Sequence, residues 1–107
     1  MSNNDEKFHF YGHKTFVNHK GNEEQRRVSI TGILHENNVV HIGIAACSLA
    51  DQFRKKKGRG ISTHRAQKNP SYNITLIPFT EGNEDSYPRK QFIAWCNDYC
   101  DKMIVEY

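Results

Sequence analysis

Alternation of apolar and polar residues over positions 27–46 is the feature that most constrains the fold of this chain. In the first half, one face carries the apolar or small residues Val28, Ile30, Gly32 and Leu34. The second half places on one face the residues Val40, Ile42 and Ile44. A period of two residues is typical of a half-buried β-strand, and Asn37-Asn38 between the halves suits a tight turn. The segment therefore predicts a β-hairpin.

Further strands are predicted on both sides of this hairpin. Positions 7–17 alternate in the same way and are broken at Gly12, which predicts a pair of short strands. Positions 18–22 form a polar turn or loop. Positions 72–79 predict one more strand, in which Pro78 favours a sheet edge or a strand end.

The clearest helix signal is at the carboxyl end of the chain. Apolar residues recur there every three or four positions, at Phe92, Ile93, Cys96, Tyr99, Cys100, Met103 and Ile104. Ser86 is expected to cap this helix, and Pro88 suits its first turn. With a second helix from Ser48 onward, we expect an α+β fold, with two helices packed on one face of a mostly antiparallel sheet of four to five strands. Residues 1–6 are expected to be a disordered tail, and residues 7–107 a single domain.

The most informative segment for function is 47–66, which carries six of the fifteen Lys and Arg residues. Ser48-x-x-Asp51 has the form of a capping box that opens a helix. This helix would carry on one face Leu49, Phe53, Gly60, Ile61 and His64. Gly58 and Gly60 each cost about 1 kcal/mol in a helix interior. Either the helix breaks near them, or they allow a ligand or another chain element to approach closely.

The cations of this segment predict a site for an anion, above all phosphate. Arg54 and Arg65 lie within about 20° of each other on an ideal helix and could clamp one anion. Free backbone N–H groups at the helix start would add a phosphate seat. The alternative is the solvated face of an ordinary surface helix. The candidate ligand-binding residues are Ser48, Arg54, Lys55, Arg59, Ser62 and Arg65.

Cysteines and histidines provide further candidates. Cys47 precedes a helix start, where the helix dipole lowers a thiol pKa, so it is either a nucleophile with His41 or His64 as base or a buried strand-end residue. Cys96 and Cys100 lie one turn apart and are expected in the core rather than in a metal site. Three more histidines are expected at the surface, namely His9, His13 and His19. No metal or cofactor is expected.

The remaining candidate side chains do not identify the ligand. His64 is expected to be half-buried and hydrogen-bonded. Five aromatic residues could either stack on a base or pack in the core, namely Tyr11, Phe16, Tyr72, Tyr87 and Trp95. Trp95 lies off the centre of its stripe, which favours an exposed position or a subunit contact. Sequence motifs for a P-loop, a serine hydrolase or a zinc protease are absent from the chain.

One resemblance covers residues 43–66. They have the pattern Gly43-Ile44-Ala45-Ala46-Cys47-Ser48-x-x-Asp51-x-Phe53-x-Lys55-Lys56-x-Gly58-Arg59-x-Ile61-x-x-x-Arg65-Ala66. This pattern resembles one in small bacteriophage and prophage proteins and is similar to that of the Thoeris anti-defence family. Members of that family bind cyclic ADP-ribose-type signals, and in some cases cyclic oligonucleotides, without cleaving them. The resemblance implies sequestration of such a signal.

The composition bears on the location and the partners of the protein. The chain has a formal net charge of +3, an odd number of cysteines and no long apolar run, so we expect reduced thiols, no membrane partner and a cytoplasmic location in a bacterial host. The sequence predicts a non-enzymatic, homo-oligomeric protein that binds an anionic nucleotide. The alternatives are a small basic DNA- or RNA-binding protein that lays the 48–66 helix on a phosphate backbone, and a cysteine-dependent enzyme.

Overall fold

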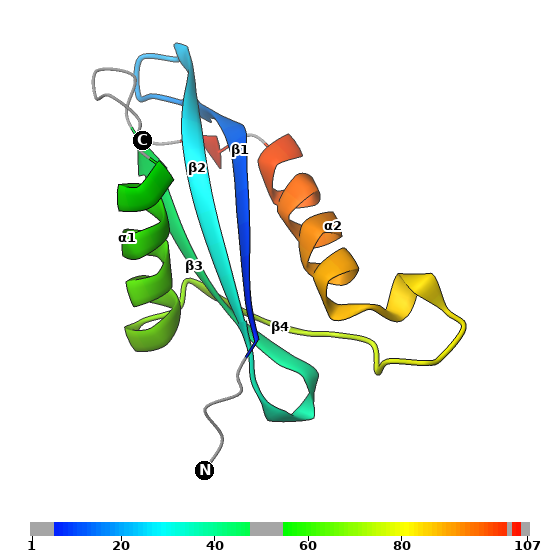
Figure 1. Ribbon diagram of the computed structural model, residues 1–107. Helices are drawn as coiled ribbons and strands as arrows, with labels where there is room; N and C mark the ends of the chain where they lie inside the picture. The colour runs from blue at the N-terminus through cyan, green and yellow to red at the C-terminus, as the bar shows by residue number, and fades with distance from the viewer. Residues whose placement is uncertain (1–5, 48–54, 103, 106–107) are drawn as a thin grey trace.

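A computed structural model describes residues 6–47, 55–102 and 104–105 of the chain, and they form a five-stranded sheet with two α-helices (Figure 1). Along the sheet the strand order is β4-β3-β2-β1-β5. Neighbouring strands are antiparallel except β1 and β5, which are parallel. The elements are β1 (Lys7–Val17), β2 (Glu23–Leu34), β3 (Val39–Cys47), α1 (Lys55–Lys68), β4 (Tyr72–Thr75), α2 (Pro88–Asp101) and β5 (Ile104–Val105). The predicted α+β class and mostly antiparallel sheet are confirmed.

Strands β1, β2 and β3 form a continuous meander. The predicted central hairpin is confirmed, with Arg27 opposite Cys47 and a turn through Asn37 and Asn38, which adopt positive φ angles of 63° and 61°. The prediction of two short strands over positions 7–17 is wrong. Gly12 pairs with Val28 within an unbroken β1, so a long partner strand carries β1 through the glycine.

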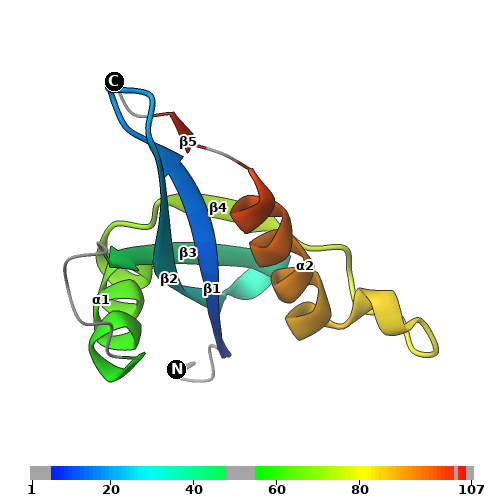
Figure 2. The same ribbon diagram turned by 90° about the horizontal axis from the view of Figure 1, so that it is seen from above.

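The two helices lie on opposite faces of the sheet, as Figure 2 shows most clearly. On β2, Thr31 contacts Ser62 of α1, whereas the adjacent Gly32 lies against Phe92 of α2. Successive strand residues point to opposite faces. The expectation that both helices pack on one face is therefore wrong, because the hydroxyl-bearing face of β2 is buried as well as its apolar face.

The main apolar core lies between α2 and the sheet. The Phe92 ring is fully buried and lies 5.5 Å from the Phe8 ring, centroid to centroid. Around them pack Val28, Ile30, Val40, Ile42, Leu76 and Cys96. Burial of the aliphatic and aromatic side chains in this cluster is the principal apolar contribution to the stability of the fold.

The start of α2 differs in one respect from its prediction. Pro88 lies in the first turn as expected, but Tyr87 occupies the cap position, and Ser86 does not cap the helix. Its buried hydroxyl accepts from the Thr80 N–H and shares its single hydrogen between the Asn83 and Thr80 carbonyls. The hydroxyl therefore closes the loop that precedes the helix.

Helix α1 packs on the sheet through small residues. It runs unbroken through Gly58 and Gly60, and Ser62 and Ala66 are fully buried against β3. A Cβ atom built on Gly43 would lie only 2.1 Å from the Ser62 carbonyl oxygen, so helix and strand are in backbone contact.

The predicted apolar face of this helix is wrong for the part that the structure describes, because Gly60 and Ile61 are exposed. His64 is exposed too, against the expectation of a half-buried residue. The first members of that predicted face, Leu49 and Phe53, lie outside the described residues, as does the expected capping box.

Strand β4 is shorter than predicted. Its pairing with β3 ends at Thr75, and the Leu76 N–H then bonds to the Asn38 carbonyl. Pro78 lies beyond the strand, in the segment that leads to α2 (Figure 1). In the part of the chain that the structure describes, neither helix is long and apolar enough to span a lipid bilayer.

Candidate functional site

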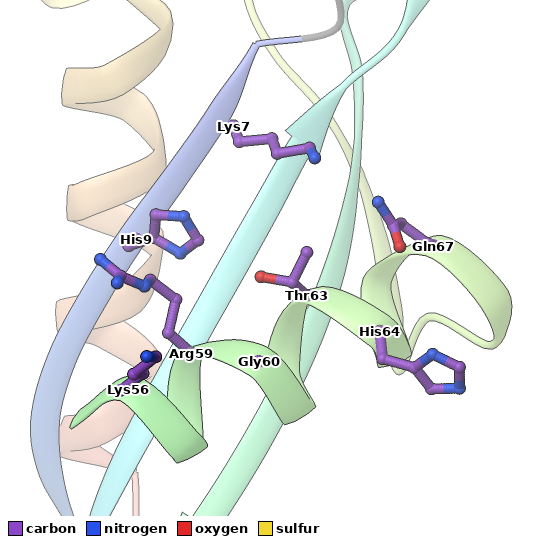
Figure 3. A pocket seen from close by; sticks show the side chains of 8 residues that line it. All are labelled: Lys7, His9, Lys56, Arg59, Gly60, Thr63, His64 and Gln67. Carbon is purple, nitrogen blue, oxygen red and sulfur yellow. The ribbon is translucent and has the colours of Figure 1, made fainter. Parts of the chain in front are cut away.

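An open pocket of about 430 Å³ lies between α1 and the beginning of β1 (Figure 3). Two of its lining residues come from β1, and the other six from one face of α1. The lining consists of Lys7, His9, Lys56, Arg59, Gly60, Thr63, His64 and Gln67. This set contains three cationic side chains, two imidazoles and no carboxylate, so the pocket offers hydrogen-bond donors and positive charge to an anion.

The two walls are brought together by strand pairing and helix packing. His9 lies opposite Thr31 in the β1–β2 register, and the fully buried Ser62 fixes α1 over Thr31. Lys56, Arg59 and Thr63 of α1 therefore lie across from Lys7 and His9 of β1 (Figure 3). Neither element forms the pocket without the other.

A chain of polar groups behind the pocket connects its two walls. His9 Nδ1 lies 3.1 Å from Thr31 Oγ1, which in turn lies 2.7 Å from Ser62 Oγ. Ser62 Oγ is also 3.2 Å from the Arg59 carbonyl oxygen, to which it can donate. The imidazole, the strand and the helix are thereby tied together, with His9 beside Arg59 (Figure 3).

Burial lowers the pKa of His9 below its ordinary value of 6.5. Positive charges add to this lowering, from Arg59, Lys7 and Arg89. Because the folded-state pKa is the lower one, the group costs stability as the pH falls through 6.5 toward the folded value, and has no such cost at higher pH.

An anion bound among these cations should reverse part of that shift. We expect saturating pyrophosphate to raise the pKa of His9, because the negative charge stabilises the imidazolium. An NMR titration of the imidazole resonances measures this, and the exposed His19 of the β1–β2 turn is the control. An identical His9 titration with and without pyrophosphate would show that no anion binds here.

The structure brings only part of the predicted ligand set to the pocket. Arg59 lines it. Lys55 begins α1, and Ser48 and Arg54 lie outside the described residues, so the proposed clamp of Arg54 with Arg65 is not tested.

Two predicted ligand residues are engaged elsewhere. Ser62 is fully buried between helix and sheet, where its hydroxyl bonds to Thr31, so it does not reach the pocket. Arg65 is not part of the lining, and its guanidinium donates to the Ile44 carbonyl at 2.6 Å. Both side chains hold α1 on the sheet, because the helix turns them toward β2 and β3.

Several pocket residues were not predicted. Lys7 and His9 belong to a strand that the sequence placed apart from the basic helix. Within α1, the spacing of Lys56, Gly60, Thr63 and Gln67 follows the three- and four-residue period of one helix face. That period was the available signal, but the expected apolar stripe, which shares Gly60 and His64 with this face, obscured it.

The thiols form no metal site in the described part of the chain. Cys96 is buried in the core and Cys100 is partly buried, as predicted, and burial raises the pKa of both. Nothing is described of the Cys47 side chain, so its role as a nucleophile stays a hypothesis.

The aromatic residues do not provide a stacking platform in the pocket, because its lining contains no Phe, Tyr or Trp. Trp95 stacks on Tyr99 at a centroid distance of 5.4 Å and packs against the core on the α2 side. Burial raises the pKa of Tyr99 to about 12. These rings are therefore part of the packing of α2.

Comparison with protein-family models, curated proteins and solved structures gives no match to this chain. The proposed function therefore rests on the residues and the geometry of the pocket.

Proposed function

We propose that this protein binds a small phosphate-bearing nucleotide in the pocket between α1 and β1 and holds it without converting it. The observation that carries the proposal is that three cations from two separate elements line one pocket whose lining contains no carboxylate. Like charges placed together cost free energy unless an anion compensates them. A phosphate group between these side chains provides that compensation.

Each cation has a distinct role in this proposal. The guanidinium of Arg59 presents paired N–H donors that match two phosphate oxygens. Lys56 adds a second charge from the previous turn of the helix, and Lys7 closes the site from the strand. The Thr63 hydroxyl adds a neutral hydrogen bond.

Sequestration is the mode of action that we propose for this binding. A protein that binds a nucleotide signal and keeps it intact lowers the free concentration of that signal. The resemblance to the Thoeris anti-defence proteins implies a signal of the cyclic ADP-ribose or cyclic oligonucleotide type, which would suit a phage counter-defence role. Native mass spectrometry after incubation with a nucleotide pool should show an adduct whose ligand is released unchanged; release of a cleaved ligand would contradict sequestration. The same spectrum measures the predicted homo-oligomer.

Removal of the pocket cations should weaken binding strongly. We expect the double variant Lys56→Ala/Arg59→Ala to bind pyrophosphate at least about tenfold more weakly, because each charge-assisted hydrogen bond contributes about 1.5–3 kcal/mol. Isothermal titration calorimetry provides the measurement. Lys68→Ala is the matched control, since Lys68 is an exposed cation of the same helix outside the pocket. An equal loss in both proteins would point to a general charge effect.

Exposed cations outside the pocket favour a second candidate function. Lys57 and Lys68 are exposed on α1, where they would contact phosphates of DNA or RNA. Binding to a nucleic-acid backbone loses about a thousandfold or more in affinity between roughly 50 and 200 mM salt. A small ligand that contacts three cations should lose far less, so a salt titration separates the two candidates.

A further inference from the structure

Gly60 differs from five other glycines of the described chain, because neither close packing nor backbone conformation requires a glycine there. Gly32 and Gly43 are required by close packing, and Gly21 and Gly82 adopt positive φ angles. Gly12 lies under the Phe10 ring and near Cys100. By contrast, a Cβ atom on Gly60 would meet no atom of the described residues within 4 Å, and its φ angle is not positive.

The position is also unfavourable for helix stability. Gly60 lies in the middle of α1, where glycine is among the least favourable residues. It is exposed, yet it lines the pocket between Arg59 and Thr63 (Figure 3). Its lack of a side chain leaves the helix backbone bare at the floor of the pocket, and glycine is typical of positions where a ligand approaches the backbone closely.

The chemical character of the lining side chains on α1 changes along the helix axis. Lys56 and Arg59 lie at the amino-terminal side of Gly60, and Gln67 lies about 10 Å further along the helix axis. The cations suit phosphate, whereas the Gln67 amide offers both a donor and an acceptor. A ligand that spans the floor therefore needs an anionic end and a flat, hydrogen-bonding end.

We infer that Gly60 is the position on which the base of a bound nucleotide rests, with the phosphates at Lys56 and Arg59 and the base edge toward Gln67. This inference rests on the proposed function and adds a specificity-determining residue to it. The phosphates alone do not need a bare backbone at Gly60. A side chain at this position should therefore exclude the base and leave the phosphate site intact.

The test compares two probes, ADP and pyrophosphate, by isothermal titration calorimetry. In the unaltered protein we expect ADP to bind at least about tenfold more tightly than pyrophosphate, which measures the contribution of the nucleoside that carries the base. Gly60→Ala should reduce this preference, and Gly60→Leu should abolish it, while the affinity for pyrophosphate changes less than about twofold.

Stability measurements show whether a Gly60 variant loses binding because it has unfolded. Gly60→Ala should raise the Tm by about 4 °C, because alanine favours the helix. The matched control is Ala94→Leu, which introduces the same leucine side chain as Gly60→Leu at an exposed position of α2 on the opposite face of the sheet. This control should leave the preference for ADP unchanged.

The possible outcomes separate this inference from the proposed function. If both Gly60 variants keep the preference for ADP over pyrophosphate, or if the unaltered protein has none, the base does not rest on Gly60 and the inference is wrong. If neither ADP nor pyrophosphate binds, or if Lys56→Ala/Arg59→Ala binds pyrophosphate as tightly as the unaltered protein does, the proposed function is wrong.

Discussion

Replacement of Gly43 by alanine is expected to lower the free energy of unfolding by about 3 kcal/mol. The new Cβ atom would lie 2.1 Å from the carbonyl oxygen of Ser62 and 2.4 Å from the nitrogen of Ala66. Both are backbone atoms of α1, so no side-chain rotation relieves the overlap. The helix has to move away from β3 or the strand has to distort.

This displacement should also affect the pocket. Helix α1 is held on the sheet by the bond between Ser62 and Thr31 and by the bond from Arg65 to the Ile44 carbonyl. A helix that moves outward weakens both bonds and carries Lys56 and Arg59 away from β1. We therefore expect pyrophosphate affinity to fall together with stability.

Urea unfolding monitored by circular dichroism measures the change in stability. Gly60→Ala is the matched control, since it makes the same substitution on the other partner of this interface, at an exposed position that has room for the methyl group. The control should gain about 1 kcal/mol. Equal stability of the Gly43→Ala protein and the unaltered protein would show that α1 does not pack on β3 as closely as described.

The contrast between these two glycines shows how far the sequence predicts the fold. Alternation in β2 and β3 arises from large apolar side chains, and such a pattern predicts strands directly. The contact of α1 with β3 depends instead on Gly43, Ser62 and Ala66, which are small and partly polar. A search for an apolar stripe selects Ile61 in place of Ser62, so the buried face of this helix was predicted wrongly.

The candidate site was predictable only in part, for a related reason. The basic character of the 47–66 segment indicated an anion, and Arg59, one of the candidate ligand residues, lines the pocket. The contribution of Lys7 and His9 depends on the pairing of β1 with β2 and on the packing of α1 across β2. No local pattern in the sequence encodes that long-range arrangement.

Lys14 is a second residue whose role only the tertiary structure reveals. It lies in the middle of β1 and is 1% exposed, on the face that packs against α2. Its ammonium donates hydrogen bonds to the Tyr99 and Lys102 carbonyls at the end of α2 and lies 3.9 Å from the Tyr99 ring centroid. A cation is favourable at this end of a helix, where the carbonyls lack helical partners and carry partial negative charge.

Lys14→Met is expected to lower the free energy of unfolding by about 3 kcal/mol, because methionine keeps an apolar chain of similar length but leaves the two carbonyls without their charged donor. Urea unfolding provides the measurement. Lys102→Met is the matched control at the same helix end, because Lys102 is well exposed and forms an exposed ion pair with Asp98, at 3.0 Å. An exposed ion pair of this kind contributes about 0.5 kcal/mol. If the two variants unfold at the same urea concentration, the buried ammonium does not hold α2 against β1.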